Sequence, residues 1–278
     1  MFKVTKPGFF TTIQDQGRFG YRDKGVPVSG VMDSISASRA NSLLENEPTA
    51  ALLEITMTGP EVEFEEDTFI CLSGARFSSK LNSEPLENDT VVKVKKGDRL
   101  SFGVLQKGFR AYLGVKGGVK EEKVLGSRSF YFPLTKRSRV IENSEINFEP
   151  SGFVPKISEM KVHEFLESKT IEVHKGPEYD LLNENQLSRL FSEAFTISKE
   201  NNRMAYQLTE YLEGHSQKML TSATLPGTVQ LTPAGRIIIL MKDGQTTGGY
   251  PRILQLTNNS ICVLAQKKFG DTIKFKWV

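Results

Sequence analysis

The chain has 278 residues, of which 38% are hydrophobic and 25% are charged, and its formal net charge is +3. These values are typical of a globular chain that forms one large or two small domains. Charged residues of both signs are spread along the whole sequence, so we expect neither nucleic acid nor a membrane as a partner. The sequence contains no apolar run of 18 residues and no signal-peptide pattern, and we therefore expect a cytoplasmic protein.

The chain begins with a short predicted strand at 2–4, followed by two polar, glycine-rich segments at 11–22 and 25–33. Apolar residues then recur at helical spacing, which predicts a helix over about 34–45. Asp33 stands immediately before this helix, where a carboxylate can accept bonds from free backbone N–H groups. We therefore expect Asp33 to be the N-cap of the helix, whatever else it does.

From residue 52 to residue 115 the sequence alternates short apolar segments with turn residues. We predict strands at 54–57, 62–64, 69–72, 91–94, 100–104 and 109–115. A spacing of roughly ten residues per strand is typical of a β-barrel or a β-sandwich. The next segment, residues 126–170, has many charges and little apolar periodicity, and we expect it to be an irregular connection.

The second half contains the clearest helical pattern, over residues 183–195. Asn183 and Gln186 have the spacing of a capping box, and the apolar residues that follow form one stripe. A strand is predicted at 171–173 and another at 237–241, where five apolar residues follow one another.

The sequence shows no recognisable motif for a cofactor. It has no phosphate-binding P-loop and no cluster with the spacing of metal ligands. The two cysteines, Cys71 and Cys262, lie in apolar segments that resemble strands, and we expect both to be small buried side chains. None of the histidines, His163, His174 and His215, belongs to a recognisable catalytic pattern.

The second half of the sequence echoes the first. An Arg-x-x-Tyr element occurs at 18–21 and again at 203–206, and a Lys-Lys-x-Gly-Asp-like turn occurs near Asp98 and again near Asp271. The shared order of these elements suggests two related β units. We therefore predict a first β-barrel-like unit at 1–125, an irregular connecting segment at 126–170 and a second β-barrel-like unit at 171–278.

The first polar segment brings Asp15, Arg18, Tyr21 and Arg22 within eight residues. Arginine binds carboxylates and phosphates through two parallel hydrogen bonds, so an anionic small molecule is one interpretation. The alternative is a structural pair of Asp15 and Arg18 that ties a loop to the barrel. Both interpretations stay open at the level of sequence.

A polar loop, Gln245-Thr-Thr-Gly-Gly-Tyr250, follows the predicted strand at 237–241 and Asp243. Its adjacent glycines, Gly248 and Gly249, allow positive φ angles, with which successive N–H groups can converge on an anion. The same composition is also typical of a plain hairpin turn. The loop is therefore either an anion-binding element or a simple connection.

Three segments carry a resemblance to a known family: Thr11-Thr-Ile-Gln-Asp-x-Gly-Arg-x-Gly-Tyr21, Gly25-Val-Pro-x-Ser-Gly-x-Met-Asp33 and Gln245-Thr-Thr-Gly-Gly-Tyr-Pro251. Two further segments, Leu53-Glu-Ile-Thr-x-Thr-Gly-Pro60 and Gly126-Ser-Arg-Ser129, add to it. Together they resemble the biotin-dependent carboxyltransferase family, which includes the 5-oxoprolinase C subunit, KipA and allophanate hydrolase subunit 2. The resemblance extends over essentially the whole chain.

The resemblance implies a mainly β fold with cyclophilin-like β-barrel units, two pseudo-repeated halves and a few short helices. It implies that the chain is the C subunit of an ATP-dependent 5-oxoprolinase, which converts 5-oxoproline to glutamate. The expected partners are a KipI-like B subunit, a larger A subunit and a small-molecule amide substrate. ATP is used by the complex, and we expect it to bind elsewhere in the assembly.

The resemblance and the residue types together suggest a catalytic and substrate-binding site. The candidate catalytic residues are Asp15, Asp33 and Asp243. The candidate substrate-binding residues are Arg18, Tyr21, Ser29, Ser127, Arg203, Tyr206, Gln245, Thr246, Thr247 and Tyr250. In this hypothesis the arginines bind the substrate carboxylate and the loop N–H groups stabilise a developing oxyanion. The sequence does not rank the three carboxylates.

The chain departs from the family pattern in the second half. Asn202 stands where an Asp is usual, Gln207 where an Arg is usual, and Gly244 where many members carry Arg. Two other functions therefore stay open. One is a carboxyltransferase component that acts on urea or a similar amide with biotin carried on a separate protein. The other is a non-catalytic regulatory binder of a KipI-like kinase inhibitor.

Overall fold

A computed structural model describes residues 1–149, 154–156, 160 and 165–278. The chain forms two compact units: the first unit comprises Met1–Arg18 and Ser29–Leu166, and the second unit comprises Phe19–Val28 and Glu167–Val278. These bounds differ from the predicted divisions at 125 and 170 in two ways: Phe19–Val28 belongs to the second unit, and the first unit extends to Leu166. Part of the predicted connecting segment, and His163 with it, lies outside the described residues.

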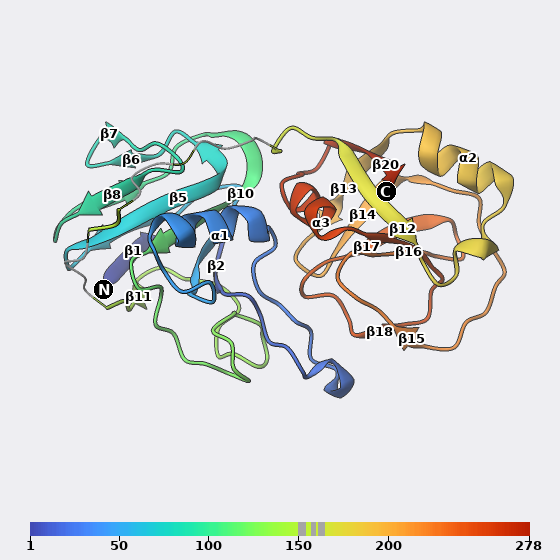
Figure 1. The fold of residues 1–278 in the computed structure, drawn as a ribbon, viewed down its shortest axis with the longest axis horizontal. Coiled ribbons are helices and arrows are strands. Elements are labelled where there is room, and N and C mark those ends of the chain that lie inside the picture. Colours follow the sequence, from blue (N-terminus) through green and yellow to red (C-terminus); the bar gives the residue numbers. More distant parts are fainter. Residues whose placement is uncertain (150–153, 157–159, 161–164) are drawn as a thin grey trace. The chain divides into compact units, whose positions relative to one another are not determined.

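Two antiparallel sheets form the first unit (Figure 1). The six-stranded sheet has the order β11 (Glu145–Ile146), β1 (Phe2–Lys6), β4 (Glu61–Phe64), β9 (Arg99–Ser101), β6 (Lys80–Leu81) and β7 (Glu84–Pro85). The five-stranded sheet has the order β2 (Phe10–Gln14), β3 (Leu52–Thr56), β10 (Leu105–Val115), β5 (Thr68–Phe77) and β8 (Val91–Val94). Successive side chains of a strand point to opposite faces, so each sheet can offer one apolar face to the core.

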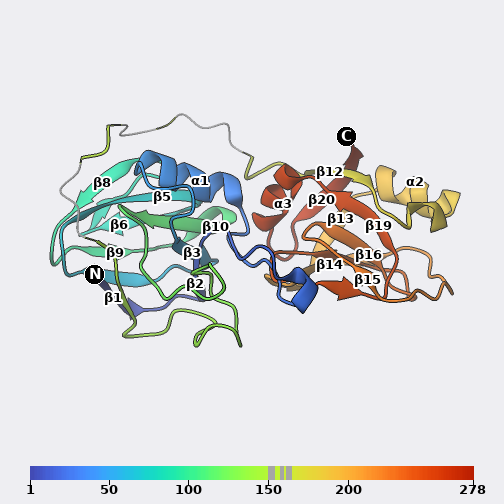
Figure 2. The same ribbon diagram turned by 60° about the horizontal axis from the view of Figure 1, so that its bottom comes forward.

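The core of the first unit contains side chains from both sheets, including Phe2, Leu53, Ile55 and Leu113. Alternate residues of the five-stranded sheet, such as Leu52, instead pack with helix α1 (Ser34–Leu43). Figure 2 shows α1 lying along β5 and β10. The five-stranded sheet is therefore buried on both faces, which explains why β3 is buried throughout.

Residues 126–149, which we expected to be an irregular connection, pack into the first unit. Phe130 and Val140 are part of its apolar core. Phe130 N donates to Ile13 O (2.9 Å), and Val140 N donates to Thr11 O (2.7 Å). The segment has little secondary structure because these backbone hydrogen bonds to β2 are isolated and do not form a continuous ladder. It is nevertheless an integral layer of this unit.

The second unit is a closed seven-stranded barrel (Figure 1). Its order is β12 (Thr170–Lys175), β19 (Arg252–Leu256), β16 (Thr228–Leu231), β17 (Arg236–Leu240), β14 (Ala205–Tyr211), β13 (Phe195–Asn201) and β20 (Thr272–Trp277). The barrel closes through the parallel pair of β12 and β20. A small two-stranded sheet pairs β15 (Ser222–Ala223) with β18 (Thr247–Gly248). Two 3₁₀ turns, η1 (Arg22–Lys24) and η2 (Tyr179–Leu181), also belong to this unit.

Helix α2 (Glu184–Ser192) confirms the predicted capping box. Asn183 Oδ1 accepts from Gln186 N (2.8 Å), and Gln186 Oε1 accepts from Asn183 N (2.9 Å). The helix is shorter than predicted, since Phe195 already begins β13. Phe191 on α2 stacks on Trp277 of β20 with ring centroids 4.3 Å apart, which anchors the helix on the barrel.

The segment around Cys262 is a helix, and our expectation of a strand there was wrong. Helix α3 (Asn258–Ala265) begins after Thr257, whose side chain accepts from Ser260 N (3.2 Å). A short apolar run fits a buried strand and a buried helix equally well, and the Thr257 cap decides for the helix. The prediction that Cys71 and Cys262 are buried side chains is confirmed.

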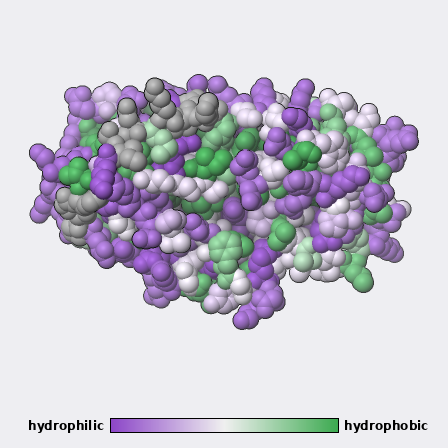
Figure 3. Space-filling view, in the orientation of Figure 1, coloured by the Kyte–Doolittle hydropathy of each residue, from purple (hydrophilic) through white to green (hydrophobic). Residues whose placement is uncertain are grey.

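The chain is mainly β with a few short helices, as predicted. Among the residues that the structure describes, no helix has the length and apolarity needed to cross a membrane. On the face drawn in Figure 3, hydrophilic residues cover most of the surface and apolar residues form small separate groups.

The echo between the two Gly-Asp turns is also visible in the structure. Lys95 N donates to Asp98 Oδ2 (2.7 Å), and Lys268 N donates in the same way to Asp271 Oδ2 (2.9 Å). The glycine of each turn has a left-handed backbone conformation. The surroundings differ, because the first turn joins two strands and the second joins α3 to β20.

Candidate functional site

Asp15 directly follows β2 and lies at the centre of a buried hydrogen-bond cluster in the first unit. Its Oδ1 accepts from Gly17 N (2.8 Å), Ser127 Oγ (2.6 Å) and Ser129 Oγ (2.7 Å). Its Oδ2 accepts from Arg128 N (2.6 Å). Four protein donors thus surround a carboxylate that is only 7% exposed. This geometry makes Asp15 a cross-link between two distant segments of the chain.

Arg18 strengthens the same cross-link. Its Nη2 donates to Ser129 O (2.5 Å) and its Nε donates to Val124 O (3.4 Å). The side chain is 1% exposed, so these bonds to backbone carbonyls form inside the unit. The structure therefore brings Asp15 and Arg18 together with Ser127, which lies about 110 residues later in the sequence.

Asp33 is fully buried and caps α1, as the sequence predicts. Its Oδ1 accepts from Ile35 N (3.0 Å) and Ser36 N (3.1 Å), and its Oδ2 accepts from Ser36 Oγ (2.7 Å). Nearby in the chain, Ser29 is also fully buried and has a φ of 56°. Its Oγ has no hydrogen-bond partner among the described residues.

A buried polar network beneath α1 was missed by the sequence analysis. Tyr112 and Glu54 are direct cross-strand neighbours, and Tyr112 Oη donates to Glu54 Oε2 (3.0 Å). Tyr112 Oη also accepts from Asp33 N (2.8 Å), while Arg110 Nε lies 3.8 Å from Glu54 Oε1. Burial, and next the Glu54 carboxylate, raise the pKa of Tyr112, so the phenol stays a neutral donor. The network fixes the position of Asp33.

In the second unit Arg203 and Asp243 form a two-bond ion pair. Arg203 Nε donates to Asp243 Oδ2 (2.8 Å), and Nη2 donates to Oδ1 (3.1 Å). Asp243 N also donates to Arg203 O (2.8 Å). The side chains are 6% and 14% exposed, so the pair lies at the border between core and surface.

The positions that depart from the family pattern have local partners. Asn202 Oδ1 accepts from Met204 N (2.7 Å) and Ala205 N (3.1 Å), which closes the turn before β14. Gln207 Oε1 accepts from Arg236 Nη1 (2.5 Å). Tyr206 is fully buried, and its hydroxyl donates to Lys267 O (3.1 Å). These side chains stabilise the barrel around Arg203.

The loop from Gln245 to Tyr250 lies over a buried glutamine. Gln230 on β16 is 1% exposed, and its amide faces Gln245 and the backbone of Tyr250 at 3.5 Å. A Cβ at residue 248 would lie 2.6 Å from Gln230 Nε2, whereas a Cβ at residue 249 would meet nothing within 4 Å. Neither Gly248 nor Gly249 has a positive φ, so that expectation was wrong. Glycine at 248 provides space for Gln230 instead.

Arg22 joins this loop from the beginning of the chain. It lies in η1, and its Nη2 donates to Thr224 O. Thr224 in turn bonds to the loop, through its N to Thr246 O (3.0 Å) and through its Oγ1 to Gln245 O. Tyr21, which precedes η1, is half-buried beside Lys24. Segments more than 200 residues apart thus meet in the second unit.

The predicted site residues therefore fall into separate groups. The first unit holds Asp15, Arg18 and Ser127 in one cluster and Asp33 with Ser29 in the α1 region. The second unit holds Arg203 with Asp243, buried Tyr206, the loop residues Gln245, Thr246, Thr247 and Tyr250, and Tyr21. Thr247 and Tyr250 are exposed and Thr246 is largely buried. Sequence analysis missed Thr224 and Gln230, because it predicted no strand at Thr228–Leu231 and no motif marks either residue.

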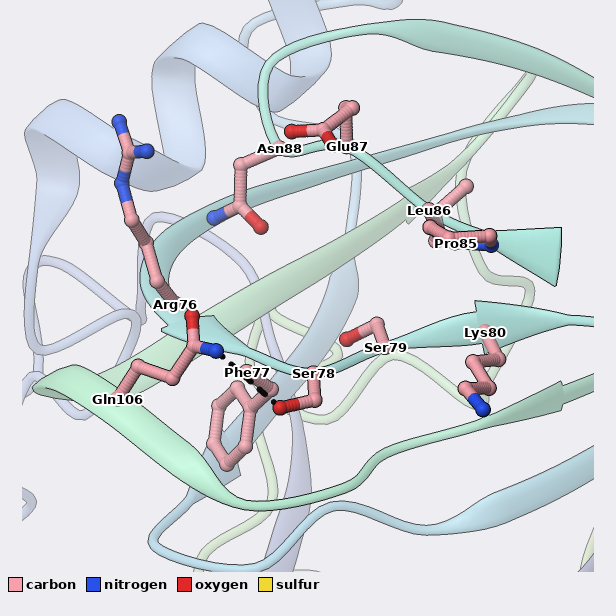
Figure 4. A pocket seen from close by; sticks show the side chains of 10 residues that line it. All are labelled: Arg76, Phe77, Ser78, Ser79, Lys80, Pro85, Leu86, Glu87, Asn88 and Gln106. Atoms are coloured by element: carbon pink, nitrogen blue, oxygen red, sulfur yellow. Dashed lines mark hydrogen bonds between the residues drawn. The ribbon is translucent and has the colours of Figure 1, made fainter.

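Two cavities in the first unit are lined by none of the predicted site residues. One, of about 280 Å³, lies between the end of β5 and residues 85–88, and Figure 4 shows Gln106 donating to Ser78 beside it (3.2 Å). The other, of about 360 Å³, is lined by residues of 121–145. Within the described ranges, no three His, Cys, Asp or Glu side chains are grouped so that they could hold a metal ion.

Comparison with known proteins identifies a protein family that matches this chain. A family model described as carboxyltransferase domain, subdomain A and B, matches residues 24–277. The C subunit of 5-oxoprolinase from Escherichia coli (strain K12) is 31% identical over 280 residues, covering 99% of this chain and 90% of that protein. Urea amidolyase of Lachancea kluyveri is 30% identical, covering 99% of this chain and 17% of that protein.

A solved structure, that of TTHA0988, matches with a TM-score of 0.91 and 26% identity. The match covers 99% of this chain and 55% of that chain, so this chain spans about half of TTHA0988. It spans a smaller part of the urea amidolyase and nearly all of the E. coli protein.

Proposed function

This chain belongs to the family of the carboxyltransferase domain, subdomains A and B, and we propose that it is the C subunit of an ATP-dependent 5-oxoprolinase. In this proposal it acts with the A and B subunits to convert 5-oxoproline to glutamate. The supporting observation is the match to the E. coli C subunit, which covers 90% of that protein at 31% identity. A match over nearly the full length of both chains favours the same role more strongly than a match to a small part of a large enzyme.

The reaction opens a lactam. Water adds to the ring carbonyl, the C–N bond breaks, and the released amine takes up a proton to give glutamate. Such a reaction needs donors for the developing oxyanion and a group that moves protons. We propose that N–H groups of the 245–250 loop are the donors, and that ATP binds to another protein of the complex.

Among the three candidate carboxylates, we propose Asp243 as the group that moves protons. Four donors surround Asp15, and Asp33 caps α1 from a fully buried position. The Asp243 carboxylate is partly exposed, and its hydrogen bonds within the described part of the chain come from Arg203 alone. It therefore keeps lone pairs for a substrate or a water molecule, and it stands two residues before the loop.

The test is glutamate formation from 5-oxoproline and ATP by this chain reconstituted with its A and B subunits. Each of the three proteins is omitted in turn, and Asp243→Asn is compared with the wild type. We expect activity only when all three are present. Glutamate formation that is unchanged without this chain would contradict the proposal.

The match to urea amidolyase favours a second candidate function, that of a carboxyltransferase component. In that case the chain would transfer a carboxyl group to urea or a similar amide from biotin on a separate carrier protein. Carboxylation of urea in the presence of carboxybiotin, with no glutamate formed from 5-oxoproline, would favour it. A stable complex with the B subunit, without either activity, would instead favour a regulatory binder.

A further inference from the structure

Arg22 is a partly buried cation without a carboxylate partner among the described residues. The hydrogen bond of its guanidinium goes to a neutral acceptor, Thr224 O. Burial lowers the pKa of Arg22 from its ordinary value, which is the effect of removing a charge from water without compensation. The neighbouring Arg252, by contrast, is paired with Glu178 through bonds of 2.6 and 2.9 Å. An uncompensated, half-desolvated guanidinium favours a bound anion.

Gln245 supplies a second group without a partner. Its Oε1 is buried and accepts no hydrogen bond from the described residues. Its Nε2 faces Gln230 Oε1 at 3.5 Å, which orients the carboxamide. A buried carbonyl oxygen without a donor is unfavourable unless a ligand supplies the donor. The ligand that satisfies it must carry an N–H or O–H group.

Thr224 connects these two groups. Its backbone O accepts from Arg22, and its Oγ1 and N bond to the loop backbone at Gln245 and Thr246. The space that Gly248 leaves for Gln230 fixes the second glutamine beneath the loop. Arg18 is not comparable, because its guanidinium is 1% exposed and donates to backbone carbonyls of its own unit.

We propose that Arg22 and Gln245 form a recognition site in the second unit for a small molecule that carries both a carboxylate and a secondary amide. The guanidinium of Arg22 binds the carboxylate, and Gln245 Oε1 accepts the amide N–H. Thr224 and Gln230 are positioning residues. This inference rests on the proposed function, since 5-oxoproline has both groups, and it assigns the carboxylate to Arg22 instead of Arg18 or Arg203.

The experiment uses the reconstituted complex and three probes. 5-Oxoproline carries both groups, 2-pyrrolidone carries the lactam without the carboxylate, and cyclopentanecarboxylate carries the carboxylate without the amide. Binding of each probe is measured by calorimetry, and KM and kcat for 5-oxoproline are measured in parallel. The variants are Arg22→Gln and Gln245→Leu. Arg189→Gln is the matched control, because Arg189 is a partly exposed arginine of the same unit that pairs with Glu193.

We expect Arg22→Gln to weaken binding of 5-oxoproline and cyclopentanecarboxylate at least about tenfold and to leave 2-pyrrolidone unchanged, since a hydrogen bond between charged groups is lost. Gln245→Leu should weaken 5-oxoproline and 2-pyrrolidone and leave cyclopentanecarboxylate unchanged. Arg189→Gln should change none of them. Arg22→Lys keeps the charge and loses the planar fork, so an intermediate effect is expected even if Arg22→Gln fails to fold.

An active wild-type complex in which Arg22→Gln and Arg22→Lys keep the wild-type KM would overturn this inference and leave the proposed function standing. If the wild-type complex binds the probes and responds to the variants as expected but forms no glutamate, the inference stands and the proposed function is contradicted. A wild-type complex that binds none of the three probes would overturn the inference directly.

Discussion

Asp15 and Asp243 are both candidate catalytic carboxylates, and yet their surroundings in the two units are opposite. Asp15 accepts bonds from four donors that belong to two distant segments. Asp243 pairs with Arg203 and is partly exposed. The arginines differ as well, because Arg18 donates to backbone carbonyls whereas Arg203 donates to a carboxylate.

The comparison shows that a charged residue in a family motif can serve either folding or chemistry. A carboxylate surrounded by protein donors is held rigidly and cannot easily exchange a proton with a ligand. A carboxylate that keeps lone pairs at a partly exposed position can. The same substitution at both positions should therefore affect different properties of the protein.

The largest expected effect is on the stability of the first unit. Asp15→Asn places an amide NH₂ among four donors and should lower the free energy of unfolding by roughly 3 kcal/mol. Asp243→Asn should cost about 1 kcal/mol, since its site is nearer the surface. Urea unfolding followed by far-UV circular dichroism measures both units, and fluorescence of Trp277, the single tryptophan, reports on the second. Equal costs for the two variants would contradict the comparison.

The next effect is on catalysis. Asp243→Asn should lower kcat of the reconstituted complex by about 100-fold, which is the lower range for loss of a general acid or base. The Trp277 unfolding midpoint is measured alongside, because a loss of activity at preserved stability separates chemistry from folding. If kcat stays close to that of the wild type, Asp243 has no proton-transfer role.

A pair of glycine variants sharpens the comparison within the loop. Gly248→Ala would bring a Cβ within 2.6 Å of Gln230 Nε2, whereas Gly249→Ala meets open space. We expect kcat/KM to fall about tenfold for the first variant, as a small displacement near the reacting groups can have such an effect. The second variant should keep nearly the wild-type value. Equal effects would show that the buried glutamine does not position the loop.

The smallest expected effect concerns pH. Hydrogen bonds from Arg252 lower the pKa of Glu178, so the ionised form is favoured in the folded protein. This contribution, about 1 kcal/mol, is present above the pKa of about 4.3 in the unfolded chain and is lost as the pH falls through the folded value. Glu178→Gln should therefore be less stable than the wild type at neutral pH and equally stable in acid below both pKa values, by Trp277 fluorescence. A difference that persists in acid would contradict this assignment.

Much of the fold could be predicted from local sequence signals. The capping box of Asn183 and Gln186 and the N-cap role of Asp33 follow from spacing alone, because helix caps involve residues three positions apart. Most longer strands of the first unit follow from short apolar segments, whereas β2, β6, β7 and β11 were not predicted. The helix at Cys262 could not be recognised in this way, because every residue from 260 to 265 is buried and periodicity disappears.

The candidate site could be predicted only in part. The loop at 245–250 and the first polar segment have a distinctive composition, and the sequence therefore drew attention to both. Composition does not reveal which side chains are already occupied, so Arg18 and Asp15 could not be distinguished from Arg22 and Asp243. Thr224 and Gln230 were missed because their importance depends on neighbours that are distant in sequence.

The division of the chain has a consequence for how the protein is made. Residues 19–28 leave the ribosome early, but the barrel to which they belong begins at residue 167. Domains generally fold in the order of synthesis. The first unit must therefore fold while residues 19–28 are still unpaired with the barrel, which has not yet been synthesised. The second unit consists of two separate stretches of the chain, so no single cut separates the two units. A truncated gene that begins at residue 167 would produce a barrel without Arg22. An engineered version of the second unit alone would therefore have to include residues 19–28, either by circular permutation or by co-expression of that segment.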